Sequence, residues 1–157
     1  RRQPMAADLR MVVTAMQVAS DLERTGDMAK QLCKRAVQIE SLSLAPKFYN
    51  GVKHMTDLVA RQLKAALDAY AARDAEKASA VIARDQKVDN FYDSIFRNLV
   101  SHMMENPTTI SSAAQLLFVA KNLERIGDHA TNIAEMVHYA ATGTHPAERE
   151  RGTGGPA

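Results

Sequence analysis

The chain has 157 residues, the size of one ordinary domain, and 46% of them are hydrophobic while 24% are charged, which excludes wholesale disorder. Its single cysteine excludes a disulfide scaffold and fits a reducing cytoplasm. With 20 basic and 18 acidic residues, the formal charge of +2 lacks the basic excess of a dedicated nucleic-acid-binding protein.

Widely spaced prolines and scarce glycines predict long helices, and apolar residues recur within them at spacings of three and four. We expect the first helix over about residues 6–42 and the second over about 48–72. The third, over about 75–105, carries Asp85 within its apolar stripe, and the fourth follows Pro107 and ends near residue 141. The fold class is therefore all-α. The stripe expected to face inward on the first helix contains Leu9, Val12, Val13, Met16, Ala19, Leu22, Ala29, Leu32, Ala36 and Ile39.

An internal repeat is the most informative feature of the sequence. Residues 19–29 align without a gap with residues 120–130, and seven of the eleven positions are identical. The offset of 101 residues is about the length of three helices, so the last three helices form one complete unit and the first helix closes a preceding unit. On this interpretation roughly 55 residues of that unit are missing and the chain is a fragment. The expected organisation is a truncated first repeat over 1–45, a complete three-helix bundle over 46–142, and a disordered tail over 143–157.

Carboxylates recur at helical spacing in both copies of the repeat. Each copy contains Leu-Glu-Arg-x-Gly-Asp, which places Glu23 with Asp27, and Glu124 with Asp128, on one helix face a single turn apart. Like charges at this spacing repel, and a bound cation relieves the repulsion. Oxygen ligands of this kind suit ions such as Mg²⁺, Mn²⁺ or iron. The third helix adds Asp85, Asp89 and Asp93 at the same spacing.

Other interpretations of these residues remain open. Acidic side chains on amphipathic helices commonly face water, and Arg125 could pair with Asp85 in place of a shared ion. The glycine before each repeated aspartate indicates a close approach, either of a neighbouring helix or of a metal-bound carboxylate. His129 is a candidate ligand or a structural histidine, and Glu135 with His138 forms one Glu-x-x-His of the type used by di-iron bundles. A ferritin-like di-metal bundle and a metal-free helical interaction module are therefore the alternatives.

With its duplicated Leu-Glu-Arg-x-Gly-Asp motif, the sequence resembles the PhoU family over residues 3 to about 143. The residues that carry this resemblance are 3–4, 8–10, 21–27, 85–92 and 122–135. It implies tandem three-helix bundles whose acidic motifs hold iron or zinc, with Mg or Mn possible. The metal ligands that it implies are Glu23, Asp27, Asp85, Asp89, Glu124 and Asp128.

The resemblance also implies a function. The PhoU family negatively regulates the phosphate-starvation response and links the ATPase subunit of a phosphate ABC transporter to a sensor histidine kinase. We therefore expect a cytoplasmic adaptor without enzymatic activity, which reaches the membrane only through its partners. Since the first helix carries an apolar face, we expect it to pack on the bundle or to pair with a second copy in a homodimer.

Overall fold

The computed structural model describes residues 3–39 and 44–146 of the chain, and every regular element within them is helical. The predicted all-α fold class is therefore confirmed. Gly143 ends the last helix with a left-handed φ of 78°, a conformation that glycine adopts without strain. Residues 147–157 of the predicted tail lie outside the described residues. The elements are α1 Gln3–Ile39, α2 Pro46–Ala72, α3 Ala75–Ile82, α4 Asp85–Glu105, the short 3-10 helix η1 Pro107–Thr109, and α5 Ile110–Thr142.

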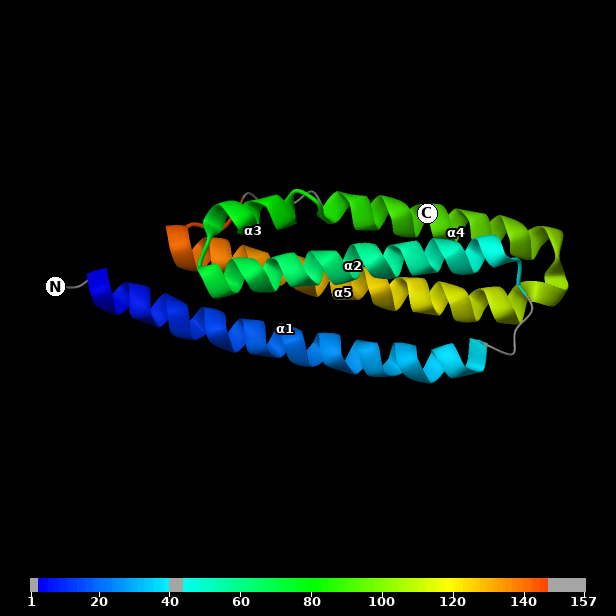
Figure 1. Cartoon of the computed structure of the whole chain (residues 1–157), viewed down its shortest axis with the longest axis horizontal. Coiled ribbons are helices and arrows are strands. Elements are labelled where there is room, and N and C mark those ends of the chain that lie inside the picture. The colour runs from blue at the N-terminus through cyan, green and yellow to red at the C-terminus, as the bar shows by residue number, and fades with distance from the viewer. Residues whose placement is uncertain (1–2, 40–43, 147–157) are drawn as a thin grey trace, which may run out of the picture.

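A three-helix bundle is formed by α2, α5 and the pair α3 and α4, which follow one another along the third side (Figure 1). Met55 of α2 and Leu99 of α4 are fully buried in one part of the core. A second part is rich in alanine and contains Ile133 of α5, also fully buried. Small side chains there let α2, α3 and α5 approach closely.

The third side of the bundle consists of two helices, so the prediction of one continuous helix over 75–105 is wrong. Asp74 caps the start of α3, because its Oδ1 accepts hydrogen bonds from the backbone N–H groups of Glu76 and Lys77, both at 3.0 Å. α3 ends at Ile82 and α4 begins at Asp85. The break places a buried carboxylate in the first turn of α4, where the helix dipole favours a negative charge.

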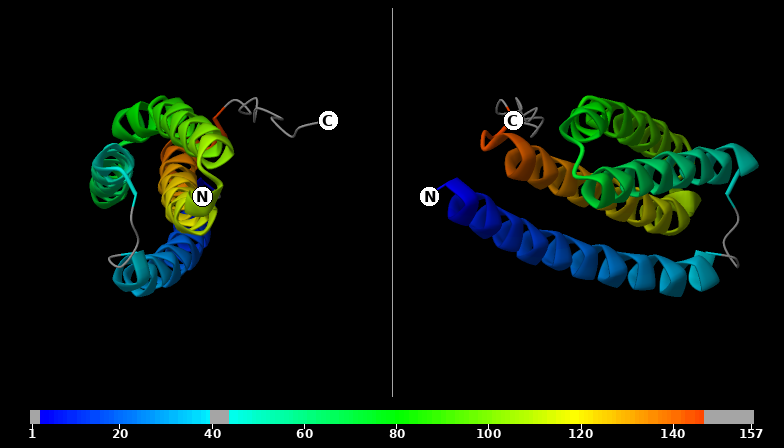
Figure 2. Two further views of the ribbon diagram at one scale, coloured as in Figure 1. Left: turned by 90° about the vertical axis from the view of Figure 1, so that its right-hand side faces the viewer. Right: turned by 60° about the vertical axis from the view of Figure 1, so that its left-hand side comes forward.

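α1 lies outside the bundle along α5, and the end-on view in Figure 2 shows it on the side of α5 away from α4. The two helices run antiparallel. Thr14 Oγ1 near the start of α1 donates to the carbonyl of Met136 at 3.4 Å, while the guanidinium of Arg35 near its end lies 3.4 Å from the centre of the Phe118 ring. The prediction that the first helix packs against the bundle agrees with this arrangement.

The side of α1 that contacts α5 is not the predicted apolar stripe. Leu9 and Met16 of that stripe are 66% and 70% exposed, whereas Val18 and Met28 are buried. Leu32 and Ile39, which belong to the stripe, do pack in the core. The inward stripe proposed for the first helix is therefore wrong over most of its length. Periodicity identifies residues that share a face, but it does not tell which face finds a partner.

The exposed stripe of α1 corresponds to the buried face of α5. At the repeat offset, Ala19 and Leu22 are equivalent to Ala120 and Leu123, which are buried against α2 and α4. Ala19 and Leu22 are exposed. The same sequence pattern is thus buried beneath two helices on α5 and exposed on α1.

Candidate metal centre

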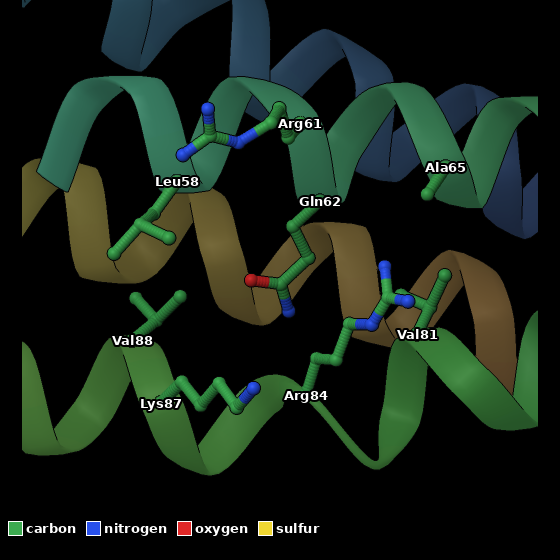
Figure 3. Close-up of a pocket in the computed structure, with 8 residues that line it drawn as sticks. All are labelled: Leu58, Arg61, Gln62, Ala65, Val81, Arg84, Lys87 and Val88. Carbon is green, nitrogen blue, oxygen red and sulfur yellow. The ribbon is translucent and has the colours of Figure 1, made fainter. Parts of the chain in front are cut away.

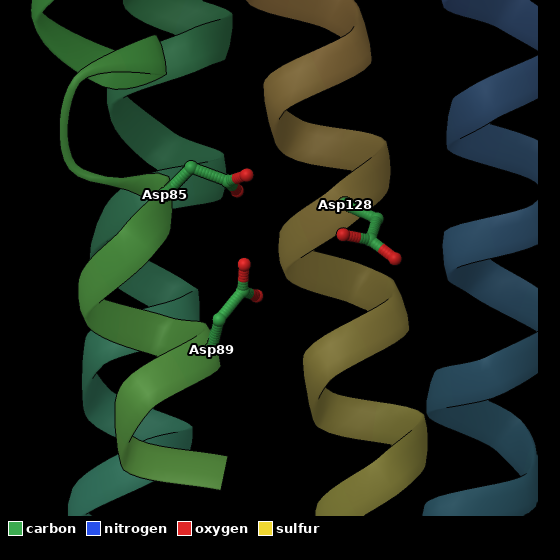
Figure 4. A group of neighbouring side chains, drawn as sticks. All are labelled: Asp85, Asp89 and Asp128. Atoms are coloured by element: carbon green, nitrogen blue, oxygen red, sulfur yellow. The ribbon is translucent and has the colours of Figure 1, made fainter. Parts of the chain in front are cut away.

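Three aspartates converge between α4 and α5. Asp85 and Asp89 lie one turn apart on α4, and Asp128 lies on the facing helix α5 (Figure 4). Each offers a carboxylate oxygen that lies within 4.8 Å of the others. The structure therefore brings together three of the six residues predicted as ligands.

Asp85 is the buried member of this group, only 5% exposed. Its Oδ1 accepts hydrogen bonds from Gln62 Nε2 at 3.1 Å and from Thr131 Oγ1 at 2.5 Å. Gln62 Nε2 also donates to Thr131 Oγ1 at 2.8 Å, which closes a three-membered network joining α2, α4 and α5. This network orients the carboxylate and compensates much of the cost of its burial.

Sequence reasoning missed both Gln62 and Thr131 and offered Arg125 as a partner for Asp85. Arg125 is exposed, and the hydrogen-bond partners of Asp85 include the two neutral side chains. A signal for them exists in the sequence, because each polar residue interrupts a run of core positions on its helix. Such an interruption on two helices predicts a buried polar contact, although it does not identify the pair.

The electrostatic environment of Asp128 disfavours its negative charge. Burial raises the pKa of this carboxyl to about 6, and the nearby charges of Glu124, Asp85 and Asp89 act in the same direction. Lys121 opposes them, but it forms an ion pair with Glu124 at 2.7 Å. A cation bound between the three aspartates would remove this repulsion.

The remaining predicted ligands lie apart from this group. Glu124 lies one turn before Asp128 and its carboxylate is engaged by Lys121. Glu23 and Asp27 are exposed on α1, and among the described residues they are not part of a group of three potential ligands. Metal binding by these three residues stays a prediction.

Neither of the candidate histidines joins the acidic group. His129 turns toward α1, where its Nδ1 lies 2.8 Å from Asp21 Oδ1. His138 Nδ1 lies 3.2 Å from the carbonyl oxygen of Thr144, near the end of α5. Within the described part of the chain, the Glu-x-x-His of the ferritin-like alternative is therefore not assembled into a di-metal set.

A glycine allows the helices beside this group to approach. A Cβ at Gly127 would lie 3.2 Å from Val88 Cγ1 and 3.9 Å from Val59 Cγ2. The close approach expected at this glycine is therefore that of neighbouring helices. At Gly26, the equivalent position in α1, a Cβ would meet nothing within 4 Å.

The chemistry of the donor set fits a metal ion. Three carboxylates and no thiolate or imidazole favour Mg²⁺, Mn²⁺ or iron over zinc, which more often takes nitrogen and sulfur ligands. The buried Asp85 is held in place by its network, and the charge of Asp128 is destabilised without a counter-ion. The group thus combines Asp85, a ligand whose position is fixed by hydrogen bonds, with Asp128, a ligand whose negative charge is unfavourable without a cation.

Comparison with known proteins identifies the family. The family model described as "PhoU domain" matches residues 1–36 and 52–137. The chain is 47% identical over 93% of its length to a "Phosphate-specific transport system accessory protein PhoU homolog" of Rhizobium meliloti, and 49% identical over 90% to one of Caulobacter vibrioides. It spans 62% of the length of each of these relatives.

A solved structure supports the same assignment. The crystal structure of PhoU from Pseudomonas aeruginosa superposes with a TM-score of 0.85 at 42% identity, covering 92% of this chain and 69% of that one. The chain therefore belongs to the PhoU family. No helix in the described residues combines the length and the apolar character that crossing a membrane requires.

Proposed function

We propose that this PhoU-family chain is a metal-binding regulatory adaptor of phosphate uptake and not an enzyme. The observation that carries the metal part is the convergence of Asp85, Asp89 and Asp128 from two helices, with the pKa of Asp128 raised to about 6. The names of the relatives, which are phosphate-specific transport system accessory proteins, support the link to phosphate transport.

The partners that we propose are the ATPase subunit of a phosphate ABC transporter and the sensor histidine kinase of the same response. The adaptor would link the two at the cytoplasmic side of the membrane and repress the phosphate-starvation response when phosphate is plentiful. Co-purification of the tagged chain with each partner, from cells grown with and without phosphate, tests this role. Failure to retain either partner in both conditions would refute it.

Elemental analysis tests the metal site separately. The wild type and Asp89→Asn/Asp128→Asn are purified identically after exposure to iron, manganese, zinc or magnesium. We expect stoichiometric metal in the wild type and loss of it in the variant, because two of three charged ligands become neutral. Asp8→Asn/Asp57→Asn is the matched control, since it neutralises two exposed carboxylates elsewhere. Absence of metal from the wild type, or equal metal in all three proteins, would refute the metal part.

The exposed face of α1 supports a further proposal, that two copies of the chain pair through it. Leu9, Val12, Val13 and Met16 form an apolar patch whose members are at least 46% exposed. Burying such a patch against its copy removes apolar surface from water. We expect sedimentation velocity to show a concentration-dependent dimer that Leu9→Lys/Met16→Lys abolishes. Met104→Lys, at an exposed apolar position on α4, should leave the dimer intact, and a wild type that stays monomeric would exclude the pairing.

A further inference from the structure

A pocket of about 230 Å³ shares one side chain with the network of the acidic group, because Gln62 both lines the pocket and donates a hydrogen bond to Asp85. It lies where α2 faces the break between α3 and α4 (Figure 3). Its lining consists of Leu58, Arg61, Gln62, Ala65, Val81, Arg84, Lys87 and Val88.

The polar part of this lining carries one sign of charge. Arg61 comes from α2, Arg84 from the break, and Lys87 from the first turn of α4. None of the described residues that line the pocket carries a carboxylate. The nearby Asp85 is not among the lining residues and accepts hydrogen bonds from Gln62 and Thr131. Three exposed cationic side chains therefore line one small space, and an anion placed there would be attracted by their combined positive charge.

The apolar part of the lining strengthens this attraction. Leu58, Ala65, Val81 and Val88 form an apolar wall, and next to such a wall charge interactions are less screened than on an open polar surface. Two of the cations are arginines, whose planar guanidinium groups offer paired donors to the oxygens of phosphate-like anions. The pocket is smaller than the roughly 300 to 1,000 Å³ typical of sites for drug-sized ligands. Its size thus suits a single small oxyanion or one terminal group of a larger molecule.

We propose that this pocket binds a tetrahedral oxyanion of the phosphate class through Arg61, Arg84 and Lys87. The proposal goes beyond the adaptor function, because it requires neither a bound metal nor a protein partner. Gln62 stands in the pocket wall and donates to Asp85 at 3.1 Å. Gln62 therefore belongs both to the oxyanion pocket and to the network of the acidic group, and we expect its amide resonances to shift when a ligand binds.

Nuclear magnetic resonance titration tests the site directly. Inorganic phosphate is added to the metal-free chain at constant ionic strength, with sodium chloride replaced as phosphate rises. We expect saturable shifts of the backbone amides of Arg84 and Lys87 and of the side-chain amide of Gln62. A linear, unsaturated drift spread over the whole surface would overturn the proposal, since it would indicate general ion screening only.

Matched charge variants make the test specific. Arg84→Gln/Lys87→Gln should weaken phosphate binding by about tenfold or more, because each removed cation was a direct contact. Arg97→Gln/Lys53→Gln removes the same charge from exposed positions on α4 and α2 outside the pocket, and should bind as the wild type does. Circular dichroism confirms that both variants fold. Equal weakening in the two variants would overturn the proposal.

Two further titrations identify the form of the oxyanion. A nucleoside diphosphate that shifts the same amides and competes with inorganic phosphate would show that a terminal phosphate also fits, whereas phosphate binding alone would assign the free ion. Both results support the site. A short polyglutamate peptide that binds at these residues while neither phosphate compound does would overturn it, since the pocket would then serve an acidic protein segment.

Discussion

Nδ1 of His129 on α5 lies 2.8 Å from Oδ1 of Asp21 on α1, and the contact joins the first helix to the bundle. Asp21 is only 2% exposed, and its Oδ2 accepts a further hydrogen bond from Gln17 Nε2 at 3.3 Å. A carboxylate so far from water depends on its protein donors. His129 therefore helps to hold α1 against the bundle, while its neighbour Asp128 belongs to the acidic group.

Removal of this carboxylate should loosen α1. Asp21→Ala leaves the imidazole of His129 and the amide of Gln17 without their acceptor, and we expect a loss of about 1 to 3 kcal/mol in the free energy of unfolding. Urea denaturation followed by circular dichroism measures it. Asp27→Ala, at an exposed position of the same helix, should change the free energy by less than about 0.5 kcal/mol. Equal stabilities of the two variants would show that the contact contributes nothing.

The two repeat helices bury equivalent positions where they meet. Asn122 of α5 is the repeat equivalent of Asp21, and Met28 of α1 is that of His129. Asn122 and Met28 are 4% and 8% exposed. Where α1 and α5 meet, each helix therefore contributes the same face of the repeat. The other face is exposed on α1 but is buried against α2 and α4 on α5.

Gly26 and Gly127, the glycines at equivalent positions of the two repeats, test this difference in packing between α1 and α5. Replacement of a mid-helix glycine by alanine gains up to about 1 kcal/mol where space allows. Gly26→Ala should show this gain, because a Cβ there meets nothing within 4 Å. Gly127→Ala should gain less or lose stability, because its Cβ would lie 3.2 Å from Val88 Cγ1. Thermal unfolding of both variants measures the difference, and equal gains would contradict the packing described at Gly127.

Much of the fold could be predicted because its signals are local. The spacing of apolar residues located the ends of most helices to within a few residues. The break before Asp85 was not predicted, since the residues around it are compatible with a continuous helix. The exposed face of α1 was missed for the related reason that tertiary contacts select which face is buried.

The acidic group was predicted in part. Asp85, Asp89 and Asp128 carry a recurrent spacing that sequence reasoning can detect. Gln62 and Thr131 carry no motif, and their role arises only when three helices bring them to Asp85. Periodicity thus identified charged side chains on shared faces, while the neutral groups that hold one of them required the packed structure.

The Thr131 hydroxyl should contribute to stability through Asp85. Thr131→Val keeps the shape of the side chain and removes the donor to the buried carboxylate, so we expect a loss of about 1.5 to 3 kcal/mol. Thr56→Val is the matched control, because Thr56 is an exposed residue whose hydroxyl donates to the carbonyl of Val52 in its own helix and not to a buried carboxylate. Chemical denaturation compares the two. Losses of the same size would show that the network around Asp85 has no special role.

The raised pKa of Asp128 predicts how metal-free stability depends on pH. In the folded chain this carboxyl has a pKa of about 6, against 3.8 for the unperturbed group. Between these values the folded state binds a proton that the unfolded state does not, so this group makes stability fall as pH rises through about 4 to 6. Asp128→Asn lacks the ionisation. In the presence of a chelator, the variant should therefore be more stable than the wild type at pH 7.5, and its advantage should shrink as the pH is lowered to 4.

Added metal should make the wild type more stable than Asp128→Asn at pH 7.5. A cation at the acidic group needs the ionised form of Asp128, so Mn²⁺ should raise the melting temperature of the wild type at pH 7.5 and much less at pH 5, where the carboxyl is protonated. Asp128→Asn should respond weakly at both values. Differential scanning calorimetry over this range, with chelator and with Mn²⁺, separates the two effects. A wild type that responds equally at both pH values would show that the ion binds away from Asp128, because a ligand site there must compete with protons.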